Sequence, residues 1–147
     1  MKFIGFDREE DAILWAKDVL GIENPTGFCR ALSAVDSEGR FAFVVILSNF
    51  TKRNIDMHTA AVCGAQWASP RETLRMFNGV FGYAFVRLKA ARVTGLVKSK
   101  NEDARRFDEH LGFKLEGVMR AAFDDDDLCI YGFLADDYKS HPWYRSI

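Results

Sequence analysis

Hydrophobic and polar residues alternate along the chain with two different periods, and these periods predict where the helices and strands lie. The opening residues 1–6 are apolar enough to form a short strand. Apolar residues then recur at helical spacing as far as Gly21, a residue type that often ends a helix. Asp7, with Glu10 three residues later, has the spacing of a capping box. The chain is therefore expected to begin with a strand and a capped helix.

Three strand-like runs follow, at 28–35, 40–50 and 54–63. The turn residues Asp-Ser-Glu-Gly between the first two runs indicate a hairpin. The second run contains the unbroken apolar stretch Phe41–Leu47, which is typical of a strand that is covered on both faces.

The longest predicted helix spans 69–90, with Ser69 as its cap and Pro70 in the first helical position. Gly79 and Gly82 weaken this helix intrinsically, so we expect close packing against a sheet to compensate. The remaining pattern predicts a strand at 92–99, a helix at 101–111 and strands at 113–123 and 128–135. The order β-α-β-β-β-α-β-α-β-β favours an α+β fold around a mixed sheet.

The composition supports one globular domain over residues 1–147, since 48% of the residues are hydrophobic and 28% are charged. A formal net charge of -1 gives no global electrostatic case for binding nucleic acid. The longest purely apolar run is too short to cross a bilayer, and acidic residues come too early for a signal peptide. We therefore expect no membrane association.

The cysteines and histidines lack the spacing of a metal site. The three cysteines, Cys29, Cys63 and Cys129, lie far apart, and the three histidines show no ligand spacing. We expect no bound metal, reduced thiols and a cytoplasmic protein.

A group of residues at fixed spacing carries a family resemblance: Asn101, Ala104, Leu111–Phe113 and Glu116–Arg120. Together with the element order, it resembles the GCN5-related N-acetyltransferase (GNAT) superfamily, closest to the type that modifies ribosomal-protein N-termini. The compact chain with its Trp/Tyr tail is also similar to small members encoded by tailed phages.

The resemblance implies a mostly antiparallel sheet of six to seven strands, with helices on both faces and a parallel, splayed pair of fourth and fifth strands. Acetyl-CoA would lie in the cleft between these two strands. Asn101 would contact the pantetheine arm, and backbone N–H groups near Ala61 and Val62 would polarise the thioester carbonyl, with Cys63 packed nearby.

The family's pyrophosphate loop is altered in this chain. Where Gln66 takes the first position of that loop, Ser69 and Arg71 stand in place of glycines, and Pro70 removes a backbone donor. Ser69 and Arg71 are still able to bind phosphate. Arg105 and Arg106 form a basic cluster beside Asn101, either as a solvated helix face or as an anchor for the 3′-phosphate of CoA.

Proton transfer requires a base and an acid. Asn54, Asp56 and His58 alternate with apolar residues and share one face of their strand, so Asp56 or His58 is the candidate to accept a proton from an amine. Many family members protonate the departing thiolate with a Tyr, but its place holds Asp108, and an ionised Asp is expected to be unable to do this.

The leading hypothesis is an N-acetyltransferase that uses acetyl-CoA to acetylate an amine directly, either a protein N-terminus, a Lys or a small amine. A catalytically inactive binding or structural module on the same fold remains an alternative, as does a different acyl-CoA ligand. A homodimer stays open.

Overall fold

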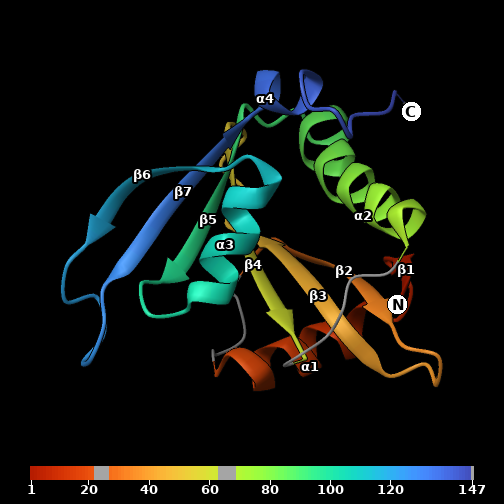
Figure 1. Cartoon of the computed structure of the whole chain (residues 1–147), viewed down its shortest axis with the longest axis horizontal. Helices are drawn as coiled ribbons and strands as arrows, with labels where there is room; N and C mark the ends of the chain where they lie inside the picture. The colour runs from red at the N-terminus through yellow and green to blue at the C-terminus, as the bar shows by residue number, and fades with distance from the viewer. Residues whose placement is uncertain (22–26, 63–68, 147) are drawn as a thin grey trace.

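The computed structural model describes residues 1–21, 27–62 and 69–146, which fold around one open seven-stranded sheet. The elements are, in chain order, β1 (Lys2–Gly5), α1 (Glu9–Leu20), β2 (Cys29–Val35), β3 (Phe41–Ser48), β4 (Asn54–Ala61), α2 (Pro70–Gly82), η1 (Tyr83–Arg87), β5 (Arg92–Lys98), α3 (Glu102–Leu111), β6 (Lys114–Met119), β7 (Leu128–Leu134) and α4 (Ala135–Lys139). The strands lie in the order β1-β2-β3-β4-β5-β7-β6. Only the β4–β5 pair is parallel, so the predicted mixed, mostly antiparallel sheet is confirmed (Figure 1).

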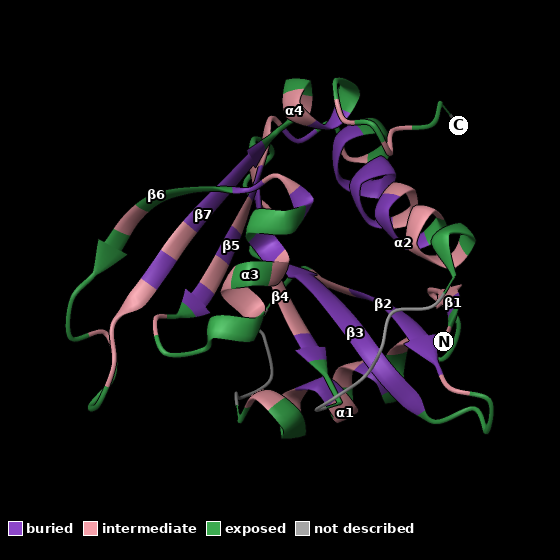
Figure 2. Cartoon of the chain, viewed as in Figure 1, coloured by how far each residue is buried: buried purple, intermediate pink, exposed green. Residues whose placement is uncertain are grey.

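Helices cover both faces of the sheet, as expected. α1 packs under β2, β3 and β4, whereas α2 lies against β1 and β2 on the opposite face and α3 lies against β5 and β6 (Figure 1). β3 is buried along its whole length, which confirms the strand predicted to be covered on both sides (Figure 2). β6 forms one edge of the sheet and stays largely exposed.

Aromatic rings fill the core between α2 and the sheet. Phe81 of α2 packs edge-on against Phe133 of β7, with ring centroids 4.9 Å apart, and Phe77 packs against Tyr138 of α4 at 5.6 Å. Rings of this size each contribute about 1.5–3 kcal/mol when fully buried, so this cluster holds the two halves of the sheet to one helix.

The predicted close packing of α2 is confirmed at Gly79. A Cβ atom built there would lie 2.7 Å from the ring of Phe3, so only a glycine lets the helix approach β1 this closely. The helical pattern beyond Gly82 continues as the π-helical turn η1, in which the Leu88 N–H donates to the Tyr83 carbonyl. This change of helix type was not expected from the spacing.

Of the three helix ends predicted from the sequence, those at Ser69 and Gly21 are confirmed. Ser69 caps α2 by accepting from the Glu72 N–H, and Gly21 and Gly112 end their helices in the left-handed conformation. The capping box predicted at Asp7 is wrong. The residue at the N-cap is Arg8 with a φ of 58°, and no side chain caps this helix.

The segment after β7 adds a short helix, α4, that the pattern did not predict. The side chain of Asn78 ties α2 to the residues beyond it, donating to the Trp143 carbonyl and accepting from the Tyr138 hydroxyl and the Arg145 N–H. Tyr144 packs edge-on against Tyr138 at 4.9 Å. Tyr138 is therefore part of the core, and Trp143 and Tyr144 pack against it.

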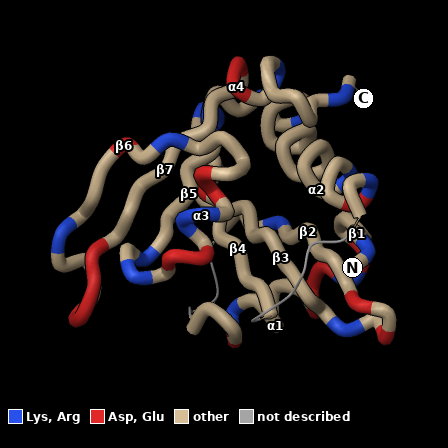
Figure 3. Tube along the Cα trace, in the orientation of Figure 1, with Lys and Arg blue, Asp and Glu red and all other residues tan. Residues whose placement is uncertain are grey.

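Charges of both signs are spread over the trace, with a concentration of acidic residues at the turn between β6 and β7 (Figure 3). Among the described residues, no helix is both long and apolar enough to cross a membrane.

Candidate functional site

The parallel strands β4 and β5 pair only over their first halves. Asn54 to Met57 lie opposite Arg92 to Gly95, and no pairing continues beyond Met57 and Gly95 (Figure 1). The second half of β4 still pairs with β3, as far as Ala61 opposite Phe43. The sheet therefore opens between two central strands, as the resemblance implied.

The opening leaves backbone groups of β4 without a strand partner on the β5 side. The Val62 N–H donates to the Ala42 carbonyl at 3.0 Å, and alternation along a strand then directs the N–H groups of Ala60 and His58 to β3 as well. The N–H groups of Thr59 and Ala61 point instead toward the opening. Ala61 is thus well placed as a donor, whereas the Val62 N–H expected to share this role is engaged within the sheet.

A cavity of ≈ 430 Å³ occupies this opening. We call it the β4–β5 cavity. It is bounded by the end of α1, by both strands, by α3 and by the β6–β7 turn. Its lining residues are Val19, Leu20, Met57, His58, Thr59, Leu96, Val97, Lys98, Asn101, Ala104, Asp108, Phe123 and Leu128.

His58 is half-buried and presents its imidazole to this cavity. Burial lowers its pKa from the ordinary value of 6.5, and the nearby charge of Asp56 opposes part of this shift. Since burial disfavours the charged form, the imidazole is neutral at neutral pH and has a free nitrogen lone pair. His58 is therefore chemically suited to accept a proton.

Asp56 lies two residues earlier on the same strand face, in the part of β4 that is still paired with β5. Its carboxylate accepts from the amides of Asn49 at 3.0 Å and Asn54 at 2.9 Å, and Asn54 in turn accepts from the Thr94 hydroxyl. Asp56 does not line the β4–β5 cavity. The strand alternation expected for Asp56 and His58 is confirmed, but only His58 reaches the cavity.

Asp108 faces the cavity from α3, a placement that the sequence analysis did not predict. Its side chain lies against Gly95, where an added Cβ would be 2.6 Å from its Oδ2 atom, and the residue is 2% exposed. Burial, followed by the charge of Glu109, raises the pKa of Asp108 from 3.8 to about 7. The expectation that this carboxyl is fully ionised at neutral pH is therefore wrong.

A signal for Asp108 was present in the helical pattern. The residues that face the sheet from α3 follow the spacing i, i+3, i+4, i+7, and they are Ala104, Phe107, Asp108 and Leu111. A single acid within an otherwise apolar stripe indicates a buried carboxyl.

Asn101 caps α3 and also borders the β4–β5 cavity. Its side-chain oxygen accepts from the Ala104 N–H at 3.2 Å, while its amide nitrogen stays free to donate. The capping role and a ligand contact are thus compatible, because they use different atoms.

The basic cluster on α3 is held in local contacts. Arg105 donates to the Tyr131 hydroxyl at 3.1 Å and to the Ser99 carbonyl, and Arg106 pairs with Asp103 at 2.7 Å. Neither arginine lines the β4–β5 cavity. Arg106 is exposed and its ion pair with Asp103 lies on the surface, so Arg106 can exchange this partner for another at a small cost in free energy. Arg105 would have to give up its hydrogen bond to Tyr131 in order to bind a ligand.

A second cavity of ≈ 400 Å³, the α2–α3 cavity, lies between the start of α2 and the second half of α3. Its lining residues are Pro70, Thr73, Leu74, Met76, Phe107, His110, Leu111, Trp143 and Arg145. Ser69 and Arg71 stand beside it at the helix start; the Ser69 hydroxyl accepts from the Glu72 N–H, and Arg71 is exposed. Cys63 and Gln66, predicted to take part in the same site, lie outside the described residues.

Within residues 1–21, 27–62 and 69–146, no group of three or more His, Cys, Asp or Glu side chains is arranged to hold a metal ion. The groups of the β4–β5 cavity that are suited to chemistry include the imidazole of His58, the carboxyl of Asp108 and the amide of Asn101.

Comparison with known proteins relates this arrangement to solved acetyltransferases. No protein-family model and no curated protein matches the sequence. A point mutant of the spermidine N-acetyltransferase SpeG from Vibrio cholerae superposes with a TM-score of 0.64 at 14% identity, covering 95% of each chain.

Two further structures agree in fold. The ribosomal-protein-S5-alanine acetyltransferase from Vibrio fischeri gives a TM-score of 0.60 at 17% identity, with 74% of this chain and 63% of that chain covered. A GNAT-family acetyltransferase from Bacillus anthracis gives 0.57 at 13%, covering 72% and 66%. At these identities the likeness shows the fold, and the chain has the fold of the GNAT acetyltransferases.

Proposed function

We propose that this protein is an N-acetyltransferase that transfers the acetyl group of acetyl-CoA directly to a primary amine. The observation that carries the proposal is the β4–β5 cavity, where a neutral His58 and unpaired backbone donors meet between two diverging strands. Fold alone does not fix function, and these groups supply the chemistry that the fold leaves open.

The residues around the cavity fit acetyl-CoA in three ways. The unpaired N–H of Ala61 can donate to a thioester carbonyl, and the amide of Asn101 can donate to a pantetheine carbonyl. The first turn of α2, with Ser69 and Arg71, offers positive charge to phosphate groups. Arg106 is the α3 cation that is freer to reach a phosphate.

The reaction needs an uncharged amine next to the thioester. His58 would accept the proton of the incoming ammonium group, and the charge of Asp56 on the same strand face would stabilise the imidazolium that results. The Ala61 N–H would then stabilise negative charge on the carbonyl oxygen during attack. Because the amine attacks the thioester directly, no acyl-enzyme is required.

The related structures suggest the acceptor class. Their names give spermidine and a ribosomal-protein alanine as the acetylated molecules, and both are amines. We therefore propose a polyamine or a protein N-terminus as the acceptor, which includes the ribosomal-protein type of substrate.

A second candidate is a non-catalytic binding module, and the start of α2 favours it. Pro70 removes a backbone donor, and the Ser69 hydroxyl is already bonded to the Glu72 N–H. Both features weaken the phosphate site that an acetyl-CoA enzyme needs.

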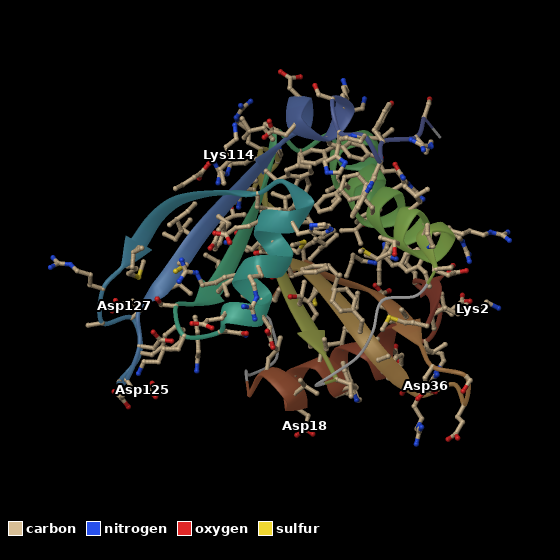
Figure 4. All side chains as sticks on the ribbon, viewed as in Figure 1. Lys2, Asp18, Asp36, Lys114, Asp125 and Asp127 are labelled. Atoms are coloured by element: carbon tan, nitrogen blue, oxygen red, sulfur yellow. The ribbon has the colours of Figure 1, made fainter. Side chains whose placement is uncertain are left out.

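Calorimetric titration with acetyl-CoA, followed by a thiol-release assay with spermidine and with an N-terminal alanine peptide, separates the two candidates. We expect micromolar binding and transfer to at least one amine. His58→Gln should lower kcat by about 10²–10⁴-fold at unchanged acetyl-CoA affinity. Asp18→Asn is a matched control, because Asp18 points into solvent from α1 (Figure 4). Absence of binding at millimolar acetyl-CoA would favour the module.

A further inference from the structure

The carboxyl group of Asp108 is buried and lacks a partner. It is 2% exposed, and among the described residues no hydrogen bond or ion pair involves its side chain. Around it lie Gly95, whose missing side chain makes room for it, and the ring of Phe113. The carboxyl group borders the β4–β5 cavity, from which a ligand could reach it.

This placement is costly for a residue that only has to pack. A buried carboxyl without a partner destabilises the folded state, and the neighbouring positions on the same helical stripe are apolar. An alanine or leucine would complete the stripe without that cost. Carboxyl groups with a shifted pKa that lie in a cleft are concentrated at functional sites, which indicates that Asp108 takes part in the chemistry of the cavity.

We propose that Asp108 is the general acid that protonates the sulfur of the departing thiol. The inference rests on the proposed acetyl transfer and adds to it the residue that completes the proton balance. Asp108 lies on the α3 side of the sheet opening, while His58 lies on the β4 face that α1 covers. The acid and the base therefore flank the same cavity from different elements.

The step balances in atoms and charge. The amine nitrogen forms a bond to the acetyl carbon, the carbon–sulfur bond breaks, and the sulfur takes the electron pair of that bond. His58 keeps the proton from the amine, and the Asp108 carboxyl gives its proton to the sulfur. Starting from an ammonium group, the nitrogen loses two protons, one to His58 before the attack and one to solvent after it. His58 then returns its proton to Asp108 through solvent, so one turnover yields an acetylated amine, a free thiol and one proton released to solvent.

The proton transfer to sulfur is favourable. A free thiol has an ordinary pKa of about 8.5, higher than the pKa of about 7 to which burial raises Asp108. A bound substrate that expels water from the cavity would raise the pKa of Asp108 further and keep it protonated. At its ordinary pKa of 3.8, the same carboxyl group would be deprotonated at neutral pH and could not donate a proton.

Few other charges act on Asp108. The titratable groups of the elements around it include Glu109 and Arg105 on α3, His58 on β4, Lys98 on β5, and Cys129 and Tyr131 on β7. Glu109, whose carboxylate accepts from the Tyr131 hydroxyl at 3.1 Å, is the one whose charge raises the pKa of Asp108. Its removal should therefore lower that pKa.

The test is a pH profile of kcat for four proteins: wild type, Asp108→Asn, Glu109→Gln and the Asp18→Asn control. Because the acid must be protonated, the wild-type rate should fall at alkaline pH. Asp108→Asn should lose about 10²–10⁴-fold in kcat, keep its acetyl-CoA affinity and lose this alkaline limb. Glu109→Gln should retain most of the rate and move the limb to lower pH.

The outcomes separate this proposal from the one on which it rests. An Asp108→Asn variant with wild-type rates and an unchanged alkaline limb would overturn the role of Asp108 and leave acetyl transfer intact. A loss of rate at every pH with the limb still present would mean that Asp108 only shapes the cavity. Wild-type protein that acetylates no amine would overturn both.

Discussion

Asp108→Asn is expected to make the folded protein more stable at alkaline pH, although it removes the proposed acid. Burial and Glu109 raise the pKa of Asp108 from 3.8 to about 7. A raised pKa means that the folded state favours the protonated carboxyl. The stability that this contributes is fully present below pH 3.8 and is lost as the pH rises through 7. An asparagine amide has nearly the same shape and does not ionise, so the Asp108→Asn variant loses no stability through this position as the pH rises.

The size of the effect follows from the two pKa values. Each pH unit between them changes the free energy of unfolding by about 1.4 kcal/mol. Between pH 5.5 and pH 8.5, wild type therefore loses about 2 kcal/mol through Asp108, because only the interval up to a pKa of about 7 contributes. Every other titrating group cancels when the variant is compared with wild type at each pH.

Urea unfolding, followed by the fluorescence of the three tryptophans, measures this difference at both pH values. The stability of Asp108→Asn relative to wild type should grow by about 2 kcal/mol from the lower to the higher pH. The exposed control Asp18→Asn should show no such change. A difference for Asp108→Asn that stays constant within about 0.5 kcal/mol would refute a raised pKa at this position.

Three further measurements test other parts of the structure. The imidazole of His58 should titrate below its ordinary pKa of 6.5 by NMR, and Asp56→Asn should move the midpoint lower still, because the charge of Asp56 opposes the shift; an upward move would contradict this. Gly79→Ala should lower the free energy of unfolding by up to about 2 kcal/mol, since overlap with Phe3 costs about 1–3 kcal/mol and the better helix former returns about 1. The same change in a Phe3→Ala background should instead be neutral or stabilising. Asn101→Ala should cost about 1 kcal/mol in thermal unfolding through the lost cap, whereas Asn101→Ser keeps a capping oxygen and should cost far less; equal losses would argue against the cap.

Most of the fold could be predicted because local rules and tertiary packing agree along most of the chain. The apolar run of β3 and the Ser-Pro start of α2 each predict the element that forms there. The capping box at Asp7 failed because tertiary contacts took the neighbouring side chains. Arg8 donates to the Gly39 carbonyl at 2.6 Å, and Glu9 bonds to Arg30 of β2. No local spacing encodes such partners.

The candidate site was harder to predict, because it depends on where two strands stop pairing. Sequence alternation placed Asp56 and His58 on one face but gave no reason to separate them. Only the end of the β4–β5 ladder at Met57 puts His58 in the cavity and leaves Asp56 outside. Likewise, the ordinary pKa of an Asp says nothing about Asp108, since its burial is created by α3 packing over Gly95.

The early separation of β4 from β5 also has a consequence for hydrogen exchange. Thr59 and Ala61 belong to a central strand, yet their amide protons face the opening between β4 and β5 and should exchange with deuterium as fast as those of an edge strand. The intervening amides of His58 and Ala60, bonded to β3, should exchange only when the sheet opens. A molecule that occupies the cavity would protect the fast pair and leave the slow pair unchanged. Hydrogen exchange at β4 would thus show whether the cavity is occupied, without a measurement of enzymatic activity.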